Sequence, residues 1–133
     1  MSITAYKGPL DIPELSPLIT EAVKQFAEPL GLKSVIWYHG DPWWFIRQEV
    51  VPRKFFREVH VAVFSKGDQP YLFLMPQACR FAQKVPPKVA RPEKWVQWSV
   101  KNLLALGDDR ARKEIGVFLS QAWQAAQKLT VSE

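Results

Sequence analysis

The side chains able to perform acid–base or nucleophilic chemistry lie in the middle of the chain. The candidates are His39, Asp41, Glu49, Glu58, His60 and Cys79. Cys79 and His60 would form a thiol–imidazole pair if the fold brought them together. Neither lies in a sequence that resembles a nucleophile turn, and a lone cysteine is most often a small buried hydrophobe. We therefore assign no catalytic residue, and an enzyme with a His/Glu or His/Cys site is the third of three functional hypotheses.

The sequence supports metal binding and nucleotide binding even less than it supports catalysis. Two histidines and one cysteine at wide spacing match no zinc pattern. The six glycines are scattered and form no phosphate-binding loop of either common kind. The sequence therefore predicts neither a metal site nor a cofactor.

The stretch HGDPWW begins at His39 and ends at Trp44. Glycine permits positive φ, aspartate suits turn positions and proline fixes φ, so the first four residues predict a turn between two strands. On a regular strand Trp43 and Trp44 point to opposite faces, and one of them can enter the core. His39, Trp43 and Trp44 are the secondary candidates for a binding site.

The excess positive charge of the chain is concentrated in one segment. The formal net charge is +5, and residues 80–101 alone hold six basic residues against one acid. A helix over 93–106 would place a tryptophan between two lysines on the side away from its apolar stripe. This arrangement suits stacking on a nucleic-acid base while the lysines neutralise phosphates. The first hypothesis is therefore nucleic-acid binding through Arg80, Lys84, Lys88, Arg91, Lys94, Trp98 and Lys101.

Other interpretations of the same residues stay open. An acidic protein surface would use the same lysines, and lysines on a polar helix face usually just face solvent. Trp98 could pack against the first helix or the sheet instead of facing a partner. The second hypothesis is a protein-interaction adaptor or assembly factor, or a homodimer formed through an open sheet face. Its aromatic anchors would come from Tyr38, Trp43, Trp44, Tyr71 and Trp98.

The elements that must position these residues follow from hydrophobic periodicity. We expect a helix over 12–30, capped by Ser16 or starting earlier at Asp11, and four strands in an antiparallel meander over 33–76. A basic, proline-rich link follows over 80–92. Two helices complete the chain over 93–129, the first opened by Pro92 and ended by Gly107. The prediction is a single α+β domain over residues 1–133.

Composition places the protein among folded domains. Apolar residues make up 47% of the 133 residues and charged residues 23%, which is typical of a globular chain. The N-terminus has no basic region followed by an apolar run, and no apolar run is long enough to span a bilayer. With Cys79 as the sole cysteine, no intramolecular disulfide can form. We expect a cytoplasmic protein that does not enter membranes.

Overall fold

The computed structural model describes residues 6–7, 9–39, 41–82 and 85–131. Its first helix, α1 (Ser16–Ala27), continues into a 3-10 turn, η2 (Glu28–Leu30). Within the predicted range 12–30, Ser16 is the first helical residue instead of the cap, and its hydroxyl donates to Asp11 Oδ1 at 2.7 Å. Gly31 ends the segment with φ of 67°, a conformation that glycine adopts without strain.

The predicted meander is confirmed. Strands β2 (Lys33–His39), β3 (Asp41–Val51), β4 (Phe55–Lys66) and β5 (Gln69–Ala82) pair with their sequence neighbours in antiparallel register. β-branched and aromatic residues dominate these segments, and short turns join them, which is what an antiparallel meander requires. β5 runs six residues beyond the predicted end of the meander at residue 76.

Over the described residues, the sheet has seven strands instead of the four predicted. β6 (Val85–Ala90) pairs with the last part of β5, where we expected an irregular link over 80–92. β7 (Val96–Ser99) pairs with the first part of β5, and the two-residue β1 (Tyr6–Lys7) pairs with β4. β6 is an edge strand, and its two prolines, Pro86 and Pro87, lie where the register between β5 and β6 is interrupted, between the pairs Ala82–Val85 and Arg80–Lys88.

The helix expected from Pro92 to Gly107 is also wrong over most of its length. Residues 96–99 form β7, and a short helix, α2 (Val100–Leu104), starts only after Ser99. The Ser99 side chain caps α2 by accepting a hydrogen bond from the backbone N–H of Asn102. Gly107 (φ 84°) then precedes α3 (Asp108–Lys128).

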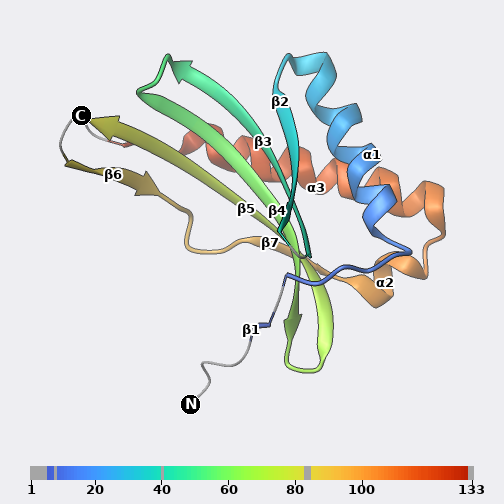
Figure 1. Ribbon diagram of the computed structural model, residues 1–133. Helices are drawn as coiled ribbons and strands as arrows, with labels where there is room; N and C mark the ends of the chain where they lie inside the picture. The colour runs from blue at the N-terminus through green and yellow to red at the C-terminus, as the bar shows by residue number, and fades with distance from the viewer. Residues whose placement is uncertain (1–5, 8, 40, 83–84, 132–133) are drawn as a thin grey trace.

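Helices α1 and α3 lie on one side of the sheet (Figure 1). The apolar stripe of α3 is buried there, from Ile115 to Ala126. Every second residue of the central strands joins the same core, namely Trp44, Ile46, Val59, Val61, Val63, Leu72 and Leu74. Strand alternation sends the intervening side chains to the other side, which we call the uncovered face because no described helix packs on it.

Aromatic rings are concentrated on the uncovered face. Register and ring contacts place there Trp43, Phe45, Phe56, Phe64, Tyr71, Phe73, Phe81 and Trp95. Four of them form an edge-to-face series across the sheet, with centroid separations of 5.7 Å for Trp43–Phe64, 5.7 Å for Phe64–Phe73 and 6.2 Å for Phe73–Trp95. We call these four rings the aromatic series.

Candidate functional site

The predicted hairpin between β2 and β3 is confirmed, with His39 opposite Asp41. Asp41 and Pro42, expected in the turn, already belong to β3, and Gly40 lies outside the described residues. The two tryptophans do point to opposite faces. Trp44 is fully buried beneath α1, and its indole N–H donates to Thr20 Oγ1 at 2.9 Å. Trp43 lies on the uncovered face and donates to His60 Nδ1 at 2.8 Å. The side chain of His39, a secondary candidate, lies outside the described residues.

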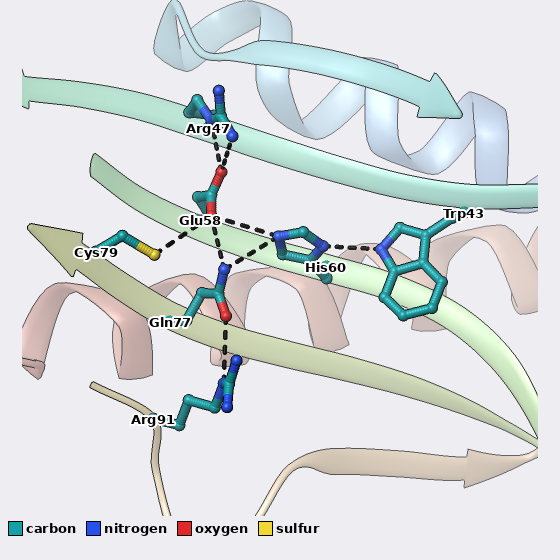
Figure 2. Close-up of polar contacts among 7 residues, drawn as sticks. All are labelled: Trp43, Arg47, Glu58, His60, Gln77, Cys79 and Arg91. Atoms are coloured by element: carbon teal, nitrogen blue, oxygen red, sulfur yellow. Dashed lines mark hydrogen bonds and ion pairs between the residues drawn. The ribbon is translucent and has the colours of Figure 1, made fainter. Parts of the chain in front are cut away.

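Five side chains form a polar row that crosses the uncovered face from one side of the sheet to the other. Lys33 on β2 lies opposite Arg47 on β3, Arg47 opposite Glu58 on β4, and Glu58 opposite Gln77 on β5. Arg91, just after β6, completes the row by donating from Nε to Gln77 Oε1 at 3.4 Å. Figure 2 shows the hydrogen bonds from Arg47 to Arg91.

Glu58 is the centre of this polar row and is only 3% exposed. Two guanidinium N–H groups of Arg47 donate to its Oε2, and Gln77 Nε2 donates to its Oε1 at 2.7 Å (Figure 2). Burial by itself would raise the pKa of Glu58, but hydrogen bonds from His60, Gln77 and Arg47 outweigh it and lower the pKa to about 2. Glu58 is therefore ionised at neutral pH and its charge is compensated.

His60 lies between Trp43 and Glu58 in the same network. An indole N–H can only donate, so Nδ1 of His60 accepts from Trp43 and the ring hydrogen resides on Nε2. Nε2 lies 3.4 Å from Glu58 Oε1. The Phe45 ring stacks on the imidazole at 5.3 Å with an interplanar angle of 20°. These contacts fix the tautomer and the orientation of the ring.

Cys79 is a buried free thiol beside this carboxylate, with Sγ 3.7 Å from Glu58 Oε1 (Figure 2). Burial and the negative charge of Glu58 raise the pKa of the Cys79 thiol to about 11. The structure thus brings His60, Glu58 and Cys79 together. However, the thiol stays protonated at neutral pH, and nucleophilic catalysis requires the thiolate.

Arg47 and Glu49 point to the same face of β3, so their residue types and spacing alone would predict an ion pair between them. Arg47 instead reaches across to Glu58 on the neighbouring strand, and Glu49 is exposed. The polar row depends on the register between strands, which no local pattern in the sequence reveals.

The predicted basic site is divided between the two sides of the sheet. Arg80 lies on the helix side, with its guanidinium 4.6 Å from the Phe55 ring centroid and its Nε donating to the Val131 carbonyl at 3.0 Å. Lys88 on β6 lies opposite Arg80, and Lys101 is exposed on α2. Lys84 lies outside the described residues.

Trp98 does not lie between Lys94 and Lys101 on a helix face. It belongs to β7 and points to the helix side, where its ring packs against Phe118 of α3 at 5.2 Å. It is 42% exposed. The expected arrangement fails because residues 96–99 add a strand to the sheet, and neighbouring residues of a strand alternate between its faces.

Sequence reasoning overlooked Trp95, which lies in a hollow of about 360 Å³ on the uncovered face. The hollow is lined by Phe73, Arg91, Pro92, Glu93, Lys94, Trp95 and Gln97. Trp95 is 38% exposed and ends the aromatic series, while Arg91 ends the polar row. The hollow therefore joins an accessible indole to two cationic side chains. On the helix expected over 93–106, Trp95 would lie at the flank of the apolar stripe, so the sequence offers no reason to select it as a binding residue.

The described residues form an α+β domain whose sheet carries helices α1 and α3 on one side. Comparisons with protein-family models, curated proteins and solved structures found no significant match to the chain. Among the described residues, no three or more His, Cys, Asp and Glu side chains are grouped so that they could hold a metal ion. No helix in that part of the chain has the length and apolar character needed to cross a membrane.

Proposed function

We propose that the protein binds single-stranded nucleic acid on the uncovered face of its sheet. The observation that carries the proposal is the hollow in which Trp95 lies beside Arg91 and Lys94. A base would stack on the accessible indole, and the two cations would neutralise the adjoining phosphates. The proposal keeps the partner expected from the sequence and moves the aromatic contact from Trp98 to Trp95.

The net charge of the sheet region supports an anionic partner, although its cations lie on both sides of the sheet. Residues 31–99, which include β2 to β7, hold eleven Lys and Arg against five Asp and Glu, whereas the remainder of the chain holds seven against eight. One of the five acids, Glu58, is compensated by Arg47, although Glu93 lines the hollow itself. An unpaired strand fits better than a duplex, because stacking on a side chain requires a base whose face is free.

The test is fluorescence anisotropy of labelled single-stranded and duplex oligonucleotides between about 50 and about 200 mM salt. Trp95→Ala is expected to weaken single-strand binding about 5-fold to 150-fold, the range measured for loss of one stacked base. The matched control is Trp98→Ala, which removes an equally exposed indole from the other side of the sheet. Equal loss in both variants, or no binding at the lower salt concentration, would overturn the proposal.

A protein partner is the second candidate, and the other end of the uncovered face favours it. Phe81 at the end of β5 and Val89 on β6 are both exposed. Apolar side chains on an open sheet are typical of protein contacts. Self-association would appear in sedimentation velocity over a wide concentration range, would survive high salt, and would be lost in Phe81→Ser.

A further inference from the structure

We propose that the bound strand crosses the sheet along the polar row, from Arg91 to a second phosphate-binding end at Lys33 and Arg47. This inference rests on the proposed function and adds the path and the far end of the site. It starts from a second hollow, of about 440 Å³, lined by Gly31, Lys33, Arg47, Gln48 and Glu49. This hollow lies at the β2 side of the sheet, whereas Arg91 and Trp95 lie at the β6 and β7 side.

The polar row connects the two hollows through side chains that are already in contact. Arg91 contacts Gln77, Gln77 contacts Glu58, and Glu58 contacts Arg47 (Figure 2). The carboxylate in the middle does not repel a phosphate strongly, because Arg47 compensates it. Arg47 keeps 42% of its side chain exposed, and Lys33 lies opposite it on β2 and is exposed. Cationic side chains therefore lie at both ends of the polar row.

The aromatic series runs beside the polar row. It crosses the same strands from Trp43 on β3 to Trp95, and the stacked pair of Phe45 and His60 lies between the two. Phe73 in the middle of the aromatic series is buried, so bases would reach the rings at its two ends, Trp95 and the half-buried Trp43. A single strand would stack its bases on these two rings and place phosphates at the cations that end the polar row. Figure 2 shows His60 linking the aromatic series to the polar row, because it contacts both Trp43 and Glu58.

The spacing of the strands sets the length of nucleic acid that this path accepts. Four steps separate β2 from β6 in the sheet order. At about 4.8 Å per step, the path is about 19 Å long. This length fits about four nucleotides, at the small end of the footprints known for single-strand-binding domains.

The experiment compares oligonucleotides from two to eight nucleotides long against Lys33→Ala and the double variant Arg91→Ala/Lys94→Ala. The double variant should weaken binding at every length. Lys33→Ala should leave binding of dinucleotides unchanged and weaken binding of oligonucleotides of about four or more. For the longer ligands, the slope of log affinity against log salt measured with Lys33→Ala should be shallower by about 0.7, which corresponds to the loss of one neutralised phosphate.

The matched control is Lys24→Ala, which removes an exposed lysine from α1 on the other side of the sheet. Glu49→Gln removes the carboxylate that lines the second hollow and should strengthen binding of the longer ligands. If Lys33→Ala behaves like Lys24→Ala while the double variant still binds weakly, the path is wrong and the proposed function stands. If no length binds to the unmodified protein, the proposed function is wrong and this inference fails with it.

Discussion

Replacing Glu58 by glutamine is expected to lower the free energy of unfolding by about 3 kcal/mol at neutral pH. The glutamine amide has the size of the glutamate carboxyl group but lacks the negative charge of the carboxylate. The substitution therefore removes the charge-assisted hydrogen bonds of the polar row. A folded-state pKa of about 2 against an ordinary value of 4.5 corresponds to this energy, at about 1.4 kcal/mol per pH unit. Because Glu58 is almost fully buried, solvent screening reduces the value little.

The pH dependence of the same variant has a defined sign. The pKa of Glu58 is lower in the folded than in the unfolded state, so the folded protein releases this proton more readily. Its contribution to stability is complete above about pH 5 and is lost as the pH falls toward about 2. The difference between the unmodified protein and Glu58→Gln should therefore narrow steadily on acidification.

Urea unfolding followed by tryptophan fluorescence, repeated from neutral pH down to about pH 3, measures this difference. Glu49→Gln is the control, since it removes an exposed carboxylate from the same face of the neighbouring strand. A Glu58→Gln variant within about 0.5 kcal/mol of the unmodified protein at neutral pH would refute the reasoning. So would a large difference that does not change with pH.

The remaining predictions concern three single side chains. Trp44→Phe should lower the free energy of unfolding in urea by about 2 kcal/mol, because it replaces a buried indole by a smaller phenyl ring and removes the hydrogen bond to Thr20. An unchanged free energy of unfolding would contradict the buried contact. Cys79 should react with iodoacetamide about a hundredfold more slowly in the folded than in the urea-unfolded protein near neutral pH, since its pKa is raised from 9.0 to about 11. For the same reason its contribution to stability should disappear as the pH rises from about 9 to about 11, which alkaline unfolding curves can show. Trp98→Ala should cost about 1–2 kcal/mol, less than a buried tryptophan, because its ring packs on Phe118 and is also partly exposed; a loss above 3 kcal/mol would place it in the core.

The parts of the fold that the sequence predicts correctly are those with local causes. The apolar stripes of α1 and α3 repeat at helical spacing, and the meander consists of β-branched runs separated by turn residues. Glycine at 31 and 107 marks helix boundaries because both positions have positive φ. Such signals need only a few neighbouring residues, so a single sequence contains them.

The strands β6 and β7 lack a local cause. A proline-rich segment is extended whether it is a free link or an edge strand, and only the exposed edge of β5 decides between the two. The four residues of β7 are too few to show strand alternation, and they adjoin a stretch with helical spacing. Tertiary pairing therefore overrides the helical pattern up to Ser99, where the side-chain cap lets α2 begin.

The candidate site depends on register even more than the fold does. Arg47, Glu58 and Gln77 meet because β3, β4 and β5 pair with particular offsets. The turn between β3 and β4 includes Arg53 with φ of 63°, and an irregularity after Glu49 shifts the pairing. A different offset by one residue would send these side chains to the helix side. Residue type and spacing alone would pair Arg47 with Glu49. The register set by the turn between β3 and β4 places Glu58 opposite Arg47 instead.

Glu58 affects the proposed binding face through Arg47, because their ion pair leaves that end of the phosphate path with less net positive charge. Its contacts with Arg47, Gln77 and His60 hold those side chains in place, and it offsets the charge of Arg47. Glu58→Gln should therefore have effects of opposite sign, lower stability together with tighter binding of oligonucleotides. The slope of log affinity against log salt should become steeper by about 0.7, as one further cation becomes effective. Weaker binding by a variant that is still folded would mean that the orientation of Arg47 matters more than its net charge.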